Sequence, residues 1–248
     1  TEANPVRLPM GAGVRLQKEG DLLPDDAKAV YQEMLGALLY LATCTRPDIT
    51  FAVGRLSRYA AAPTTAHLAA AKTVLRYLKG TTALALEYGK DAHLQGYSDA
   101  DFAADVDSRR STTGYLFLRN GAAISWLSKI QPTVAASTTE AEYVAASMAA
   151  KEAVWMQRLD KELGGTGAAV PLKCDNQGAI AMMRNPTSSA RTKHIDVCHH
   201  FIREKVEEGR IKVDHVGTAE MMADSLTKPL ATVAFGTCRS GMGLRPMA

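Results

Sequence analysis

The sequence lacks several features that would place it in a specialised class of protein. Its four cysteines form no Cys-x-x-Cys pair. Neither a zinc site nor a disulfide framework is therefore expected, and reduced thiols of an intracellular protein are the natural interpretation. No apolar run approaches the roughly 18 residues of a membrane span, and no signal-peptide pattern opens the chain. We therefore expect an intracellular protein without a membrane partner.

A strong net charge is also lacking. The 248 residues carry a net charge of only +3, with 22% charged and 46% hydrophobic residues, which is the composition of an ordinary globular protein. Any nucleic-acid site must therefore come from local basic patches. The chain begins at Thr1 without a methionine, which suggests a fragment of a longer protein.

The apolar pattern changes along the chain and divides it into four parts. Residues 1–24 lack periodicity and predict an irregular lead-in. Residues 25–82 have apolar residues at helical spacing and predict a small helical region. Residues 83–230 alternate between strand and helix patterns, and residues 231–248 predict a loosely structured tail.

The third part is predicted to be an α/β domain. Period-two segments such as "LQGYSDAD" predict strands, and Asn120-Gly121 predicts the two-residue turn of a hairpin. Later strands, "VPLKCD" and "IKVDHVG", alternate with helices, and a last helix is expected near "TAEMMADSLTKPL". An antiparallel hairpin followed by parallel strands with helical crossovers fits this order. Trp126 and Trp155 fall at strand and helix spacing and are expected in the core.

Two glutamates open the long helix that begins with "STTEAEYVAA". Ser137 and Glu140 have the spacing of a capping box, which gives Glu140 a structural role. Glu142 has no such role. It shares a helix face with a row of small residues, namely Ala145, Ala146, Ala149 and Ala153. A carboxylate on such a face needs a cation or hydrogen bonds, because an unpaired buried charge is very costly.

Three aspartates occupy positions where α/β sheets gather their sites. Asp99 and Asp175 end predicted strands, and Asp224 lies at the start of the predicted last helix. Together with Glu142 they would repel one another unless divalent cations bound between them. Oxygen ligands suit Mg²⁺ or Mn²⁺, and two ions about 4 Å apart suit phosphoryl displacement. Each aspartate taken singly is more often a turn or cap residue than a ligand, and spacing alone makes a joint metal site and separate structural roles equally favoured.

Five segments in a fixed order resemble a known family: "YSDADFAADVDSRRSTTGYLF", "ISWLSKIQPTVAASTTEAEYVA", "CDNQGAI", "RTKHIDVCHHFIREKV" and "VDHVGTAEMMADSLTKPL". From Leu94 to Pro229 the chain resembles the ribonuclease H domain of copia-type retrotransposon polyproteins. Residues 27–80, notably "GALLYLATCTRPDITFAVGRLSRY", resemble the connection segment between the polymerase and that domain. Phe102 and Ala104 depart from the family pattern without touching the four carboxylates.

The resemblance implies a ribonuclease H-like fold, with a mixed five-stranded sheet flanked by helices and preceded by the helical connection region. It implies an enzyme that uses two Mg²⁺ ions, or Mn²⁺ in their place, to cut the RNA strand of RNA–DNA hybrids. By the same resemblance Asp99, Glu142, Asp175 and Asp224 match the metal ligands, and His215 matches a histidine before the last helix. The expected partners are the hybrid and an upstream polymerase domain. The expected location is a cytoplasmic virus-like particle, the nucleus or both.

Two basic patches are candidates for nucleic-acid binding. Arg109 and Arg110 lie in the loop "SRRST" before the hairpin. Lys72, Arg76 and Lys79 recur at i, i+4 and i+7 on a helix whose apolar stripe is predicted to include Leu68, Leu75 and Leu78. Either patch could bind phosphates or could simply be solvated.

Two other functions compete with the nuclease. The domain could be a non-catalytic nucleic-acid-binding or tethering module of the polymerase, against which the four intact acids argue. It could also catalyse DNA transesterification as integrase-type relatives do, although those are expected to rely on fewer acids. The Tyr-x-Asp-Asp polymerase signature is absent, so polymerisation is not expected.

Overall fold

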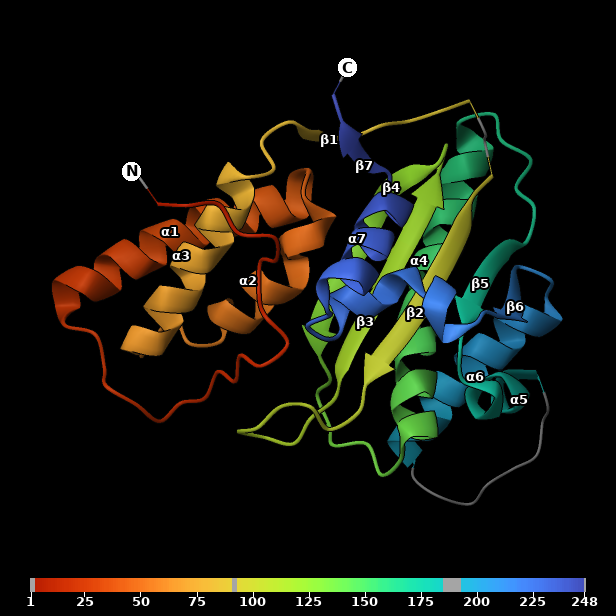
Figure 1. Ribbon diagram of the computed structural model, residues 1–248. Helices are drawn as coiled ribbons and strands as arrows, with labels where there is room; N and C mark the ends of the chain where they lie inside the picture. Colours follow the sequence, from red (N-terminus) through yellow and green to blue (C-terminus); the bar gives the residue numbers. More distant parts are fainter. Residues whose placement is uncertain (1–2, 91–92, 185–192, 248) are drawn as a thin grey trace.

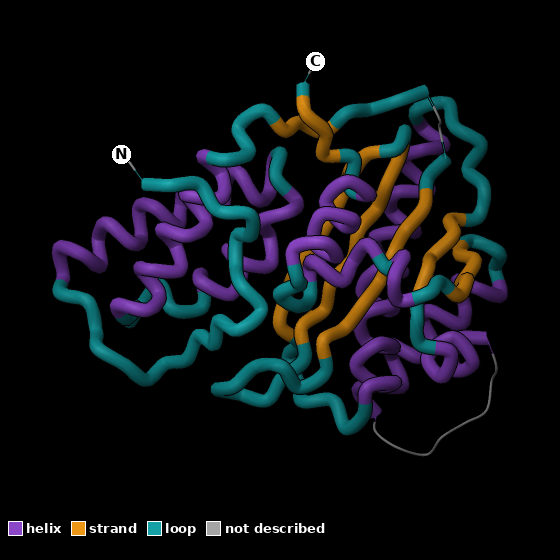
Figure 2. Tube along the Cα trace, viewed as in Figure 1, coloured by secondary structure: helices purple, strands orange, loops and turns teal. Residues whose placement is uncertain are grey.

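The computed structural model describes residues 3–90, 93–184 and 193–247. Figure 1 shows a helical region beside a twisted sheet that has helices on both faces, and Figure 2 separates the helices from the strands by colour. Among these residues no helix combines the length and the apolar character needed to cross a bilayer.

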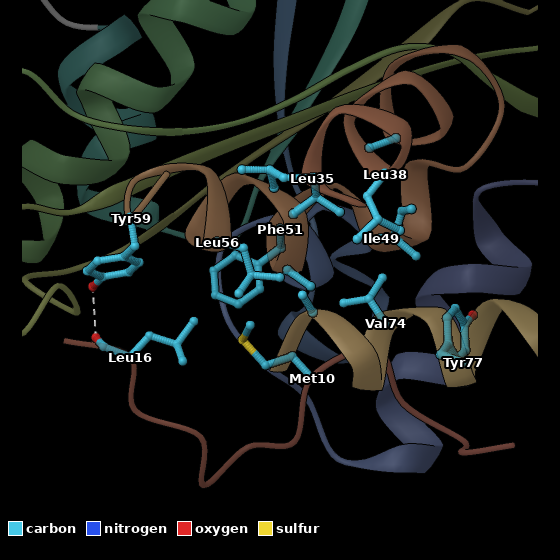
Figure 3. Packing of buried hydrophobic residues seen from close by; sticks show 14 of the residues in the cluster. Met10, Leu16, Leu35, Leu38, Ile49, Phe51, Leu56, Tyr59, Val74 and Tyr77 are labelled. Atoms are coloured by element: carbon cyan, nitrogen blue, oxygen red, sulfur yellow. Dashed lines mark hydrogen bonds between the residues drawn. The ribbon is translucent and has the colours of Figure 1, made fainter. Parts of the chain in front are cut away.

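The helical region contains three α-helices and one short 3₁₀ turn: α1 (Asp25–Cys44), η1 (Pro47–Ile49), α2 (Thr50–Ser57) and α3 (Thr65–Lys79). Their inner faces form one apolar cluster, which Met10 and Leu16 of the lead-in complete (Figure 3). The buried face of α3 consists of His67, Ala71, Val74 and Tyr77.

The predicted apolar stripe of α3 is therefore wrong in one respect. Leu75 is 41% exposed, whereas Tyr77 is fully buried. Hydrogen bonds, as well as apolar contacts, decide which residues of α3 are buried. The Tyr77 hydroxyl donates to Asp48 Oδ2 at 2.5 Å, and His67 Nδ1 accepts from the Thr64 N–H at 2.8 Å. These bonds turn residues with polar atoms inward, and Leu75 faces outward in consequence.

The sheet has the order β4-β3-β2-β5-β6. Its strands are β2 (Gln95–Asp101), β3 (Thr112–Arg119), β4 (Ala122–Ile130), β5 (Val170–Cys174) and β6 (Ile211–His215). β2, β3 and β4 are antiparallel, and β5 and β6 add in parallel. Asn120 and Gly121 both have positive φ angles, 56° and 78°, as the predicted two-residue turn requires. The predicted mixed five-stranded sheet is confirmed.

Each face of the sheet has its own core. α4 (Thr138–Glu162), α5 (Gln177–Arg184) and α6 (Lys193–Glu207) cover one face, and their apolar residues join Phe117, Leu172 and Val213 of the strands. The other face carries the short 3₁₀ helices η2 (Thr218–Glu220) and η3 (Met222–Leu226) and the helix α7 (Thr232–Gly241). There Tyr97, Leu116 and Leu118 pack against residues of this segment.

The segment after β6 departs from prediction. A single last helix was expected near residues 218–230, but η2 and η3 are two separate 3₁₀ turns. Pro229 explains part of this difference, because it lacks an N–H and the segment cannot continue as a regular helix through it.

The prediction of a loosely structured tail is wrong. α7 is followed by β7 (Leu244–Pro246), which pairs antiparallel with β1 (Leu84–Leu86). Phe235 packs in the core of the helical region, while Met242 packs against the sheet. Gly236 and Gly241 lower the helix propensity of this segment, so α7 is held in place by tertiary packing.

Two of the polar contacts between the helical region and the sheet domain involve Trp126 and Arg58. Trp126, which is half-buried, donates from Nε1 to the Ala42 carbonyl at 2.7 Å. Arg58, at the end of α2, forms an ion pair with the buried Asp105 in the loop before β3. The expectation that Trp155 belongs to the core is wrong, because this residue of α4 is 54% exposed.

Candidate active site

The structure brings the four predicted carboxylates to one place. Asp99 lies near the end of β2, Asp175 follows β5, Glu142 lies near the start of α4, and Asp224 lies in η3. Asp99, Asp175 and Asp224 each offer a carboxylate oxygen within 4.8 Å of the others, and Glu142 and Asp175 meet in the same way. β2 and β5 are adjacent parallel strands, so their carboxyl ends lie at the same end of the sheet, and this brings Asp99 and Asp175 together.

A glycine allows η3 to approach the sheet closely enough for Asp224 to join the group. Gly114 of β3 is the register partner of Asp99. A methyl group on Gly114 would lie 2.7 Å from Thr227 Cγ2 and 2.9 Å from Leu226 Cβ. Any side chain at this position would therefore push η3, and Asp224 with it, away from Asp99.

The two glutamates of α4 separate as predicted by helix face. Ser137 Oγ accepts from the Glu140 N–H at 3.1 Å, and Glu140 Oε2 accepts from the Ala136 N–H at 3.0 Å. In a capping box the Glu140 side chain would accept from the Ser137 N–H. Here it accepts from the N–H of the preceding residue, Ala136. Glu142 is only 6% exposed, and its small neighbours Ala145, Ala146, Ala149 and Ala153 are fully buried.

The electrostatic environment favours protonation of two of these acids when no cation is bound. Burial, and then the charges of Asp99 and Asp175, raise the pKa of Glu142 to about 9. Burial and the charge of Asp99 raise the pKa of Asp224 to about 7. Shifts of this kind are typical of functional sites.

Lys228 is a member of the site that the sequence analysis did not single out. Its Nζ lies 2.8 Å from Asp224 Oδ1 and 3.8 Å from Asp99 Oδ2. Burial lowers the pKa of Lys228, but Asp99 and Asp224 outweigh it and raise this pKa to about 12. The Thr227 hydroxyl donates to Asp99 as well. The i, i+4 spacing of Asp224 and Lys228 was the available signal.

The donor set fits a divalent cation bound through oxygen. Glu142 Oε2 is buried and has no hydrogen-bond partner among the described residues. Within the part of the chain that the structure describes, only one ammonium group, that of Lys228, is paired with these carboxylates. Cys174 Sγ lies beside Glu142 and Asp175. Burial raises the pKa of this thiol to about 12, so it stays protonated and leaves carboxylate oxygens as the available ligands.

His215 lies at the edge of this group. It ends β6, is exposed, and is the register partner of Cys174, the residue before Asp175. The Thr218 hydroxyl, three residues later, donates to Asp175 Oδ2 at 3.1 Å. The structure thus places His215 close to the carboxylates without assigning it a contact with them.

The predicted basic patches have different surroundings. Arg109 and Arg110 are exposed in the loop before β3. On α3, Arg76 Nε donates to the Asn4 carbonyl at 2.7 Å and Lys79 Nζ to the Ala3 carbonyl at 3.1 Å. The lead-in therefore engages two of the three stripe residues, and Lys72 remains exposed.

The strand order, together with carboxylates at the ends of β2 and β5, defines an α/β domain of the ribonuclease H-like class. No family model matches the chain. The chain is 44% identical, over 98% of its length, to the "Retrovirus-related Pol polyprotein from transposon TNT 1-94" of Nicotiana tabacum, of which it spans 19%. Over nearly its whole length the chain is thus similar to a short part of retrovirus-related Pol polyproteins of transposons.

Two further similarities accompany this one. The "Secreted RxLR effector protein 161" of Plasmopara viticola is 54% identical over 51% of this chain and 90% of that protein. The crystal structure of LC11-RNase H1 in complex with an RNA/DNA hybrid aligns with 54% of this chain and 93% of its own, at 15% identity and a TM-score of 0.41.

Proposed function

We propose that this chain is a copia-type ribonuclease H, an Mg²⁺-dependent endonuclease that hydrolyses the RNA strand of RNA–DNA hybrids during reverse transcription. The observation that carries the proposal is the group of four buried or half-buried carboxylates, which among the described residues meet with a single ammonium as counter-charge. Similarity to transposon Pol polyproteins supports it, because reverse transcription produces RNA–DNA hybrids.

Asp99, Glu142, Asp175 and Asp224 would hold two Mg²⁺ ions, and Mn²⁺ can substitute. When bound, such ions activate a water and stabilise the departing 3′ oxygen, which leaves a 5′-phosphate and a 3′-hydroxyl. The chain itself supplies the placement. β2 and β5 fix two ligands on a rigid sheet edge, and Gly114 lets η3 bring the third against them. Lys228 offsets part of the negative charge until the cations bind.

His215 is proposed to act at the rim, where an exposed imidazole can help to rearrange the site after cleavage. Substrate choice would rest on contacts to the 2′-hydroxyls of the RNA and on the groove shape of the hybrid. The proposed partners are the hybrid and the upstream polymerase domain, in a cytoplasmic virus-like particle or the nucleus.

The test uses the purified chain with an RNA–DNA hybrid whose RNA strand carries the label. We expect cleavage with Mg²⁺ or Mn²⁺, none with a chelator, and none of double-stranded DNA of the same sequence. Asp99→Asn and Asp175→Asn should each abolish cleavage and leave the circular dichroism spectrum unchanged. If either variant cuts within tenfold of the parent, the site assignment is wrong. Binding without any cleavage by the parent would favour the non-catalytic module instead.

A further inference from the structure

A second candidate site lies where the helical region meets the sheet. A pocket of about 210 Å³ opens between α2 and the ends of β3 and β4. Its polar lining consists of Arg55, Ser57, Arg58, Thr112, Ser128 and Lys129. The ionisable residues of the pocket lining are all basic, which suits an anionic ligand.

The register of the sheet places this pocket level with the carboxylates. Asp99 pairs with Gly114, and Gly114 pairs with Ser128 on the next strand. Paired residues share a face of the sheet, so Ser128 faces the same side as Asp99. Neighbouring strands are about 4.8 Å apart, which separates the pocket from Asp99 by roughly 10 Å. For a duplex whose axis lay in this direction, that distance would span about three base pairs at an axial rise of about 3.4 Å.

The cations of the pocket differ in how free they are. Arg58 is held by Asp105, as described above. Arg55 is half-buried, and among the described residues its Nε has no hydrogen-bond partner. Lys129 follows Ser128 on the edge strand β4 and pairs with Thr113, so its side chain points to the opposite face of the sheet. Arg55 thus has hydrogen-bonding capacity that a phosphate group can use.

One acidic residue, Asp101, lies close enough to interact with charges of both the pocket and the active site. Asp101, the last residue of β2, feels the charges of both Lys228 and Arg55. A strand of nucleic acid that crossed the carboxylate group would therefore meet positive charge on the α2 side.

We propose that this pocket binds one backbone phosphate of the bound nucleic acid through Arg55. The helical region would then position the substrate through α2, whereas its α3 stripe is largely engaged by the lead-in. The proposal rests on the proposed function for the identity of the ligand, but it concerns binding and not cleavage.

The test measures affinity for a fluorescent RNA–DNA hybrid against salt concentration in a chelator, so that no cleavage occurs. Arg55→Gln should make the log–log salt slope shallower by about 0.9, the value for one phosphate, whereas Lys129→Gln should leave it unchanged. Between 50 and 200 mM salt the loss of affinity should shrink about threefold to fourfold for Arg55→Gln. Arg55→Lys should keep most of the slope.

The matched controls are Arg158→Gln and Lys161→Gln, both exposed on α4. Arg158 is about 24 Å along that helix from Glu142, so neither control should change the slope. Melting temperatures of all variants identify a folding defect, and Arg55→Met tests the site if Arg55→Gln does not fold.

The possible results separate this inference from the proposed function. A parent that binds and cleaves, with the slope unchanged in Arg55→Gln, overturns the phosphate site and leaves the nuclease intact. A parent that binds but never cleaves overturns the nuclease, while shallower slopes still support the phosphate site. Equal slope changes in Arg55→Gln and the α4 controls would mean a general charge effect and would also overturn the proposal.

Discussion

The helical region and the sheet domain both bury acidic residues, but they satisfy them differently. Asp48, 2% exposed, accepts two bonds from Arg46, at 2.9 and 2.8 Å, and one from the Tyr77 hydroxyl. Glu142, 6% exposed, retains a carboxylate oxygen without a hydrogen-bond partner among the described residues. Burial alone therefore does not distinguish the two kinds of acid.

The difference lies in the supply of cations and donors. A buried ion pair whose hydrogen bonds are complete needs nothing further and holds its surroundings together. A group of carboxylates with one ammonium between them has a deficit of positive charge, which a bound cation can remove. The joint between the two regions belongs to the first kind, because Asp105 accepts bonds from Arg58 and from the N–H and hydroxyl of Ser108.

The largest effect expected is at Glu142. Glu142→Gln should abolish hybrid cleavage, because it removes a proposed metal ligand from the centre of the group. Glu140→Gln should keep the cleavage rate and cost about 0.5–2 kcal/mol in the free energy of unfolding, the range for a helix cap. Cleavage assays and urea unfolding of both variants make the comparison. Loss of activity in Glu140→Gln at normal stability, with activity kept in Glu142→Gln, would mean that the pair is reversed.

The next effect concerns stability and pH at the joint. Burial raises the pKa of Asp105, but bonds from Arg58 and Ser108 outweigh it and hold the pKa well below its usual range. The stabilisation is therefore present above the unfolded pKa of about 3.9 and is lost as pH falls through the folded value. Arg58→Gln should lower the free energy of unfolding at pH 7 by about 1–3 kcal/mol. Urea titrations should show a smaller difference from the parent at pH 3.

The stability of the metal-free protein should depend on the active-site carboxylates with the opposite pH trend, falling as pH rises. Glu142 and Asp224 have raised pKa values in the folded protein. Their ionisation therefore destabilises the fold as pH rises through the window between the unfolded values near 4 and the folded values. In a chelator, Glu142→Gln should flatten this decline between pH 5 and pH 8, and Mg²⁺ should reverse it in the parent. A parent whose melting temperature rises over that range would contradict the assignment.

A smaller effect is expected at His215. His215→Ala should slow steady-state turnover by several-fold, because product release loses a basic group at the rim, and should leave metal affinity unchanged. Titration calorimetry with Mg²⁺, combined with single-turnover and steady-state rates, separates the two effects. If both rates equal those of the parent, His215 is a solvated residue at the end of β6 and nothing more.

The smallest effect is expected on α3. The spacing of Lys72, Arg76 and Lys79 would predict a salt slope shallower by roughly 2–3 units after replacement of all three by Gln. The structure reduces this expectation, since Arg76 and Lys79 are bonded to carbonyls of the lead-in. We now expect a change of about 0.9, from Lys72 alone. A change of two units or more would show that the lead-in is displaced when the substrate binds.

The sequence was most informative where one residue type has one physical purpose. Asn120-Gly121 specifies a turn with positive φ angles, and Glu142 stands on a face of alanines where an acid has no structural use. It was least informative where tertiary contacts decide. Nothing local indicated that Tyr77 would displace Leu75 from the core, or that Phe235 would reach the helical region. Lys228 was overlooked because a lysine near an acid on a short segment usually lies on the surface.

The pairing of β1 with β7 and the placement of Phe235 have a consequence for the order of folding. Leu86 is paired with Leu244, so the ends of the sheet domain close a loop of almost the whole domain. Such long-range contacts form late, because the entropy of loop closure must be met first. During synthesis the helical region emerges before the sheet domain, yet its core stays incomplete until Phe235 has been made. The earlier of the two regions is therefore among the last to reach its final packing, because its apolar face must await a residue that follows the sheet domain.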